Sequence, residues 1–314
     1  MVVLLGTGSG TFQAPATFAV GNYPVGVAVG DFNGDGHLDI VTANANDNTV
    51  SVLLGTGSGT FQAPATFAVG NYPVGVAVGD FNGDGHLDIV ATNEDAGDGT
   101  VSVLPGTGSG TFQAQAIFAV GSYPEDVAVG DFNGDGHLDI VTANANDNTV
   151  SVLLGTGSGT FQAQAIFAVG SYPEDVAVGD FNGDGHLDIV TANANDNTVS
   201  VLLGTGSGTF QAQATFAASL PYGVAVGDFN GDGHLDIVTS SQFESTVSVL
   251  LGTGSGSFQA QSTFDVEGFS YSVAVGDFNE DGPLDIVVSN YIDHFVSVLL
   301  GVCRSQLEQR RFSS

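Results

Sequence analysis

The chain has 314 residues, of which 46 are glycine, about twice the ordinary share, and its formal net charge is −31. Its three cationic residues are all arginines within residues 304–311, so residues 1–303 contain no Lys or Arg. Nucleic acids and anionic membrane surfaces are bound largely through Lys and Arg, so this composition excludes both as partners and disfavours anionic small substrates. No apolar run reaches the length of a membrane-spanning helix, and the single Cys303 cannot form an internal disulfide.

From the N-terminus, the sequence opens inside a repeated unit of short apolar segments. Residues 2–5 and 11–20 have the sequence of the third and fourth segments of such a unit. The first full unit follows, with segments at 27–30 (strand A), 38–41 (strand B), 50–54 (strand C) and 60–69 (strand D). The segments show no helical periodicity, and several alternate with a period of two residues, which predicts four short β-strands per unit. The last unit, residues 272–301, has strands A, B and C but no strand D.

A nine-residue loop of pattern D-x-N-x-D-G-x-x-D joins strands A and B in every unit. Successive copies are separated by 49, 51, 49, 48 and 49 residues. A period near 50 residues with four short strands is typical of the blades of a β-propeller. The loops begin at Asp31, Asp80, Asp131, Asp180, Asp228 and Asp277.

The same loop has the composition of a calcium site. Side-chain oxygens recur at positions 1, 3, 5 and 9, and a hard cation such as Ca²⁺ takes six to eight oxygen ligands. A glycine such as Gly36 at position 6 permits the positive φ that turns the chain around an ion. Asp-Gly and Asn-Gly are also good hairpin turns without any metal, which is the alternative interpretation. A turn needs only one such dipeptide, however, so the repeated carboxylates predict about six Ca²⁺ ions.

The segment VAVGDFNGDGHLDIV, followed by TVSVLLGTGSGTF, is similar to the FG-GAP/VCBS repeat, the calcium-loop blade also found in integrin α-chain propellers. The resemblance covers residues 1–301 and implies a secreted or cell-surface protein with an adhesive or ligand-binding role. It implies Ca²⁺ ligands at loop positions 1, 3, 5 and 9, and the backbone carbonyl at position 7. These residues are Asp31, Asn33, Asp35, His37 and Asp39; Asp80, Asn82, Asp84, His86 and Asp88; Asp131, Asn133, Asp135, His137 and Asp139; Asp180, Asn182, Asp184, His186 and Asp188; Asp228, Asn230, Asp232, His234 and Asp236; and Asp277, Asn279, Asp281, Pro283 and Asp285.

We therefore expect an all-β protein, a β-propeller of six blades with four antiparallel strands each, within residues 1–301. Strand D of the last blade would come from residues 11–20, which would close the ring and remove exposed sheet edges. Residues 2–5 would then be a spare strand; a seven-bladed ring, or a fragment of a larger propeller, is the alternative. Residues 302–314 differ in composition and are expected to be a disordered tail.

Catalytic residues are not expected. Five of the six histidines stand at loop position 7, where the carbonyl would meet the metal, and no Ser/His/Asp arrangement is present. The acid pairs Glu125-Asp126 and Glu174-Asp175 could serve a glycosidase, but adjacent acids in one loop are commonly just solvated.

The two faces of the predicted ring differ. The calcium loops are nearly uniform, whereas the loops joining strands B and C, and D and A, vary and carry tyrosines. We expect a monomeric, calcium-stabilised extracellular module that binds a neutral or cationic glycan or protein on the face opposite the calcium loops. A purely structural segment of a large surface protein is the alternative, and a glycan hydrolase or lyase is less favoured. Each tyrosine could instead pack under its own loop; the six are Tyr23, Tyr72, Tyr123, Tyr172, Tyr222 and Tyr271.

Overall fold

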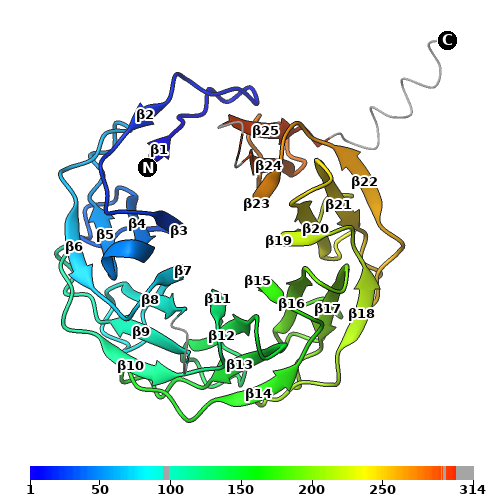
Figure 1. The fold of residues 1–314 in the computed structure, drawn as a ribbon, viewed down its shortest axis with the longest axis horizontal. Coiled ribbons are helices and arrows are strands. Elements are labelled where there is room, and N and C mark those ends of the chain that lie inside the picture. The colour runs from blue at the N-terminus through cyan, green and yellow to red at the C-terminus, as the bar shows by residue number, and fades with distance from the viewer. Residues whose placement is uncertain (95–98, 291, 293–294, 302–314) are drawn as a thin grey trace.

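The computed structural model describes residues 1–94, 99–290, 292 and 295–301, and the tail expected at 302–314 lies outside that part. The fold is a β-propeller in which six antiparallel sheets stand around a central axis (Figure 1). Within each sheet the strands are paired in chain order, with the first strand at the axis and the last toward the rim. The all-β, six-bladed architecture predicted from the repeats is confirmed.

The blades are numbered in chain order, and their strands A to D follow one another in sequence. Blade 1 contains β3 (Pro24–Gly30), β4 (Asp39–Asn44), β5 (Thr49–Leu53) and β6 (Ala65–Ala68), with the 3₁₀ helix η1 (Ala45–Asp47) between β4 and β5. Blade 2 contains β7 (Pro73–Gly79), β8 (Asp88–Asn93), β9 (Thr100–Leu104) and β10 (Ala116–Ala119). Blade 3 contains β11 (Pro124–Gly130), β12 (Asp139–Asn144), β13 (Thr149–Leu153) and β14 (Ala165–Ala168).

The remaining blades repeat this order. Blade 4 contains β15 (Pro173–Gly179), β16 (Asp188–Asn193), β17 (Thr198–Leu202) and β18 (Ala214–Ala217). Blade 5 contains β19 (Pro221–Gly227), β20 (Asp236–Ser241), β21 (Thr246–Leu250) and β22 (Ser262–Asp265). Blade 6 has three strands within the residues that the structure describes, β23 (Ser270–Gly276), β24 (Asp285–Asn290) and β25 (Phe295–Leu299).

Ring closure differs from the prediction. Strand β2 (Ala16–Thr17) does not extend blade 6; it pairs with β1 (Val2–Val3), the strand expected to be spare, in a separate two-stranded sheet. Its register, Val3 opposite Ala16, repeats that of strands C and D in blade 1, where Val52 lies opposite Ala65. The pairing follows from the sequence, because residues 1–20 keep both strands and the glycine turn between them.

This N-terminal hairpin occupies a seventh position between blades 6 and 1 (Figure 1). Gly10 N donates to Phe278 O of blade 6 at 3.1 Å, just as Gly110 N of blade 2 donates to Phe32 O of blade 1 at 3.0 Å. On its other side, the Leu5 side chain lies against Gly59 of blade 1. The ring therefore has seven positions, six filled by blades and one that the described residues fill only in its outer half.

The apolar core lies between neighbouring blades. Phe32, Val41 and Val52 of blade 1 pack with Ile89 and Leu104 of blade 2, and all five side chains are buried. Equivalent clusters lie between the next pairs of blades around the ring. Since these side chains are apolar and removed from water on both faces of a blade, inter-blade packing is the main source of stability.

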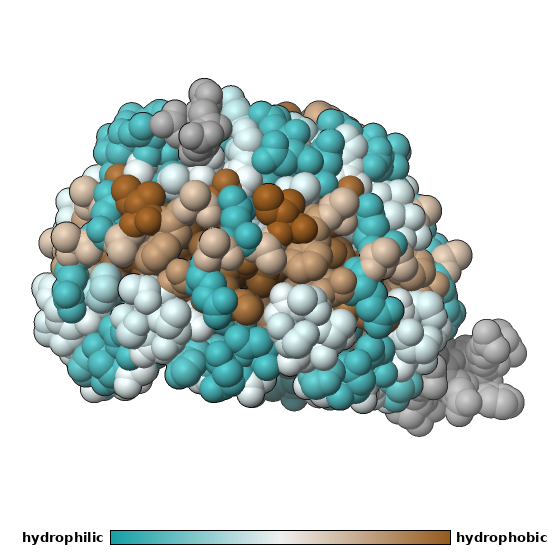
Figure 2. Space-filling view, turned by 90° about the horizontal axis from the view of Figure 1, so that it is seen from below, coloured by the Kyte–Doolittle hydropathy of each residue, from teal (hydrophilic) through white to brown (hydrophobic). Residues whose placement is uncertain are grey.

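The outer rim carries an apolar band between two polar faces, seen on the side of the ring formed by β10 and β14 (Figure 2). Ile117 on β10 and Ile166 on β14 are exposed there. In the part of the chain that the structure describes, no helix is long and apolar enough to cross a membrane.

Candidate functional site

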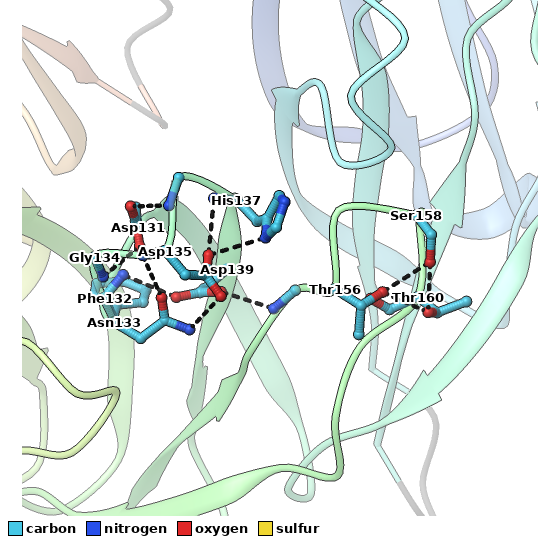
Figure 3. A network of polar contacts seen from close by, with 12 residues as sticks. Asp131, Phe132, Asn133, Gly134, Asp135, His137, Asp139, Thr156, Ser158 and Thr160 are labelled. Carbon is cyan, nitrogen blue, oxygen red and sulfur yellow. Dashed lines mark hydrogen bonds and ion pairs between the residues drawn. The ribbon is translucent and has the colours of Figure 1, made fainter.

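The A–B loops hold their first carboxylate on the loop backbone. In blade 3, Asp131 Oδ1 accepts hydrogen bonds from the N–H groups of Gly134 (2.7 Å) and Asp135 (3.2 Å), and its Oδ2 accepts one from Gly136 (2.8 Å) (Figure 3). The equivalent Asp31 makes the same three bonds, led by the one from the Gly36 N–H, and they lower the pKa of its carboxyl. The loop is thus pre-shaped around this carboxylate by its own backbone donors.

The last aspartate of each loop is a buried link between two hairpins. Asp139 Oδ2 accepts from Phe132 N at 2.8 Å, and its Oδ1 accepts from Gly155 N, at the start of the C–D hairpin, at 2.7 Å. Burial raises the pKa of the Asp139 carboxyl, and the nearby Asp135 and Asp131 add to the rise. The same pair of bonds is made by Asp39, Asp88, Asp188, Asp236 and Asp285.

The histidines at position 7 direct their rings at the C–D hairpin. A Cβ on Gly157 would lie 2.3 Å from the imidazole of His137, and the other four histidines stand equally close to their own hairpin glycines. The His137 Nδ1 also lies 3.1 Å from Asp135 Oδ1. Glycine at that position of the hairpin is required by its positive φ of 70–74°, and the imidazole lies against the space that the missing side chain leaves, a contact that sequence reasoning did not foresee.

The loops fit a hard cation by the kind of atoms they offer. Asp31, Asn33 and Asp35 present oxygens within one exposed or half-buried loop, without softer thiol ligands. Among the described residues, however, no group of three or more His, Cys, Asp or Glu side chains is gathered as a metal site. The carboxylates instead accept backbone hydrogen bonds, although each oxygen has a second lone pair that can face an ion.

A second constellation lines the axis of the ring. A cavity of about 500 Å³ is bordered mainly by the second and third residues of the A strands, which stand nearest the axis. The second residues of the six A strands form one layer, made of Val25, Val74, Glu125, Glu174, Tyr222 and Tyr271. The third residues form the next layer, made of Gly26, Gly75, Asp126, Asp175, Gly223 and Ser272.

The two acid pairs lie in this cavity, not in solvated loops as their adjacency suggested. Burial raises the pKa of Glu125 to about 8, and Glu174, Glu94 and Asp126 add to the rise by charge repulsion. Burial likewise raises the pKa of Glu174 to about 7, although a hydrogen bond from Tyr222 opposes the shift. Sequence reasoning missed this because strand A begins at the proline before each pair, three residues earlier than the apolar pattern indicated.

The deeper acids connect neighbouring blades. Asp126 Oδ2 accepts from Val176 N of blade 4 at 3.3 Å, and Asp175 Oδ2 accepts from Val224 N of blade 5 at 2.8 Å. Burial raises the pKa of both carboxyls, and the charge of Asp126 adds to the rise at Asp175.

The six tyrosines form two sets rather than one. Four stand in the D–A loops with φ between 50° and 59°: Tyr23, Tyr72, Tyr123 and Tyr172. The other two, Tyr222 and Tyr271, lie on β19 and β23 at the strand position that Glu125 and Glu174 occupy in blades 3 and 4. Their rings are 4.5 Å apart, and the two hydroxyl oxygens are 3.0 Å apart. Only this second set reaches the axial cavity.

These features define a β-propeller whose blades each carry an aspartate-rich A–B loop. The chain belongs to the FG-GAP-like repeat family, whose model matches residues 1–42, 32–91, 80–142, 131–191, 180–239 and 228–288. No curated protein matches the chain.

Several solved structures share the fold at low sequence identity. A functionally unknown protein from Desulfotomaculum acetoxidans is 15% identical, with a TM-score of 0.69, over 91% of this chain and 84% of that one. A protein from Lactobacillus plantarum is 14% identical, with a TM-score of 0.54, over 88% and 82% of the two chains. A protein from Bacteroides uniformis that is named a 6-phosphogluconolactonase is 13% identical, with a TM-score of 0.57, over 88% and 82%. At these identities the likeness concerns the fold alone.

Proposed function

We propose that this propeller is a calcium-stabilised extracellular binding module, without catalytic activity, whose ligand enters the axial cavity. The observation that carries the proposal is the layer of Glu125, Glu174, Tyr222 and Tyr271, which combines carboxyl groups and aromatic rings in one cavity. The cavity opens among the first residues of the A strands, on the side of the D–A loops and opposite the calcium loops.

The chemistry of the layer favours a cationic group. Burial raises the pKa values of Glu125 and Glu174, and residues 1–303 supply no Lys or Arg that could neutralise these carboxyls. An amine or guanidinium would neutralise the carboxylates and could stack on the tyrosine rings. We therefore favour a protein ligand that inserts a basic side chain over a neutral glycan.

The loop oxygens would hold Ca²⁺, in a scaffold role. In blade 1 these are the side chains of Asp31, Asn33, Asp35 and Asp39 and the His37 carbonyl, and the other loops repeat the set. Six ions would add 6 × 2 = 12 positive charges and change the net charge from −31 to −19. Calcium-dependent modules of the extracellular space work at the high Ca²⁺ concentration found there, which fits a scaffold role.

The test is binding of short arginine- or lysine-containing peptides, with neutral oligosaccharides in parallel, measured by calorimetry at constant Ca²⁺. Peptide binding should strengthen as the pH rises from 6 to 8.5, because the carboxyls must ionise, and it should release protons. The double variant Glu125→Gln/Glu174→Gln should bind at least about tenfold more weakly, the loss expected for one charge-assisted contact.

A matched control changes the other face. Thr205→Ala/Ser207→Ala alters a glycine hairpin beside the calcium loops and should leave peptide binding unchanged. If this control abolishes binding while the glutamine variant binds normally, the ligand face is the wrong one. Tight, pH-independent binding of an oligosaccharide would replace the basic peptide by a glycan as the ligand class.

A further inference from the structure

The seventh position of the ring is open on the side of blade 1. Val27 and Val29 on β3 are 60% and 54% exposed, and Leu38 is 66% exposed. The residues equivalent to Val27 in blades 2 to 6 are 4–8% exposed, because each packs on the blade before it; they are Val76, Val127, Val176, Val224 and Val273. Blade 1 thus presents an apolar face that every other blade buries.

Blade 6 presents the complementary face. Val287 is only half-buried, whereas its equivalents Val41, Val90, Val141, Val190 and Val238 are fully buried. The equivalents of Gly276 each receive a leucine from the next blade: a Cβ on Gly227 would lie 2.6 Å from Leu284. A Cβ on Gly276 would meet only Phe278 of its own blade, at 3.5 Å. Gly276 is therefore not covered by a leucine from a following blade, and Leu38 does not lie on the strand-A glycine of a preceding blade.

The rim of the same position offers an unpaired strand edge. Strand β1 corresponds to strand C, which in the blades pairs with strand B on one side and strand D on the other. Within the described residues β1 pairs with β2 alone. Inside β1, none of the described residues forms a strand at this position (Figure 1), and the partly exposed apolar faces of blades 1 and 6 lie at its two sides.

We propose that this open sector is a docking site for a β-hairpin of the repeat's own A–B type. Strand B of the incoming hairpin would pair with β1. The leucine of the hairpin that is equivalent to Leu284 would lie on Gly276, and the glycine that ends its strand A would receive Leu38. The proposal continues an interface that the ring already makes between each pair of neighbouring blades, with the same residue types on both sides.

The probe is a synthetic peptide with the sequence of residues 24–44, which spans one A–B hairpin, added to the full chain in Ca²⁺ buffer. We expect saturable one-to-one binding by fluorescence anisotropy and an increase in Tm. Gly276→Ala should weaken binding at least about tenfold, because its methyl group occupies the place of the incoming leucine. The variant itself should keep the Tm of the parent, since its Cβ meets only ordinary contacts.

Two controls define the occupant. A peptide with aspartate at the position of Leu38 should bind as poorly as the parent peptide binds to Gly276→Ala. Gly227→Ala, at a glycine already covered by Leu284, should lower the Tm of the chain. Absence of peptide binding, or equal binding to Gly276→Ala, would overturn the proposal. A dimer of the chain in sedimentation that Gly276→Ala dissociates would identify a second copy as the occupant instead.

Discussion

The aspartate at loop position 9 shows how one residue can serve two purposes. The sequence predicts this residue to be a calcium ligand from its place at position 9 of the loop. In the structure Asp139 is buried and accepts two backbone hydrogen bonds, which join the A–B loop to the C–D hairpin. A buried donor without an acceptor costs about 1–3 kcal/mol. The carboxylate therefore has a structural role that does not depend on metal.

Replacing Asp139 with alanine should destabilise the protein even without calcium. The variant leaves the Phe132 and Gly155 N–H groups unsatisfied, so the free energy of unfolding should fall by about 2–5 kcal/mol. Urea unfolding in excess EDTA measures this directly. Asp139→Asn keeps one carbonyl oxygen and should lose about half as much. Equal stability of parent and alanine variant in EDTA would assign the residue to the metal alone.

The sixth loop contains a local strain that the other five avoid. Glu280 has φ +60°, where the other loops place glycines with φ between 71° and 74°. A left-handed conformation costs a side-chain-bearing residue about 1 kcal/mol. The greater entropy of glycine in the unfolded chain offsets part of any gain.

We therefore expect Glu280→Gly to raise the free energy of unfolding by about 0.5–1 kcal/mol, seen as a higher Tm in calorimetry. The reverse change in blade 5, Gly231→Glu, is the matched control and should lower stability by a similar amount. If both variants melt like the parent, the backbone in these loops relaxes at no cost.

The axial glutamates should make stability depend on pH. Their pKa values of about 8 and about 7 in the folded chain exceed the ordinary 4.5, so the folded state keeps protons that the unfolded chain releases. Their contribution is complete below pH about 4.5 and is lost as the pH rises through 7 and 8. The Tm at constant Ca²⁺ should thus fall between pH 6 and 9.

Glu125→Gln/Glu174→Gln should flatten this decline, although the Asp126–Asp175 pair keeps part of it. Glu267→Gln, at an exposed site, should leave the profile of the parent unchanged. A parent Tm that is constant across this range would mean that both glutamates are ionised in the folded protein.

At the scale of strands, the repeats determine most of what can be predicted. The nearly identical loop sequences, the apolar alternation and the period of the repeat predicted the blade and its strand order, because each follows from local spacing. Closure was not predictable in this way: residues 11–20 can pair either with a strand C far away in sequence or with residues 2–3, and both partners have the same sequence pattern. The structure selects the local partner, which a short glycine turn already brings close.

The axial site illustrates the other limit of sequence reasoning. Glu125 and Tyr222 occupy the same strand position. When the repeats are aligned so that Tyr222 matches Tyr123, blade 5 is shifted by two residues and this equivalence is hidden. The prolines, Pro124 and Pro221, give the correct alignment because both begin strand A. The proline was the available signal that the acids belonged to a strand at the axis.

Deletion of residues 1–5 should be nearly as damaging as deletion of residues 1–20. The short deletion removes β1, the pairing partner of β2, and also Leu5, which lies against Gly59. We expect a lower Tm by thermal denaturation, with the hairpin contact to blade 6 lost in both variants. Leu5→Ala should give a smaller decrease, from lost packing alone. A harmless short deletion beside a damaging long one would restore the role of residues 2–5 as a spare strand.

At the scale of the whole ring, six loops of like charge lie on one face of the molecule, each with three aspartates. Two carboxylates about 4 Å apart repel by about 4 kcal/mol at an effective dielectric near 20. Backbone hydrogen bonds offset part of this within each loop, but they do not change the net charge of the face. Cations bound in the loops would neutralise the negative charge of this face and hold each A–B loop in one conformation.

We therefore expect chelation to destabilise the entire ring. Each site filled at about 100 times its Kd stabilises the folded state by about 2.7 kcal/mol, so excess EDTA should lower the Tm of metal-loaded protein by many degrees. Native mass spectrometry should count six Ca²⁺ ions per chain. The sixth loop should bind an ion despite the strained Glu280, because it keeps the side-chain oxygens of Asp277, Asn279, Asp281 and Asp285. Asp281→Ala removes one of these ligands and should reduce the count to five. The same melt with and without EDTA, starting from protein with verified metal content, would show that the backbone hydrogen bonds alone hold these loops and that the hairpin-turn interpretation is the correct one.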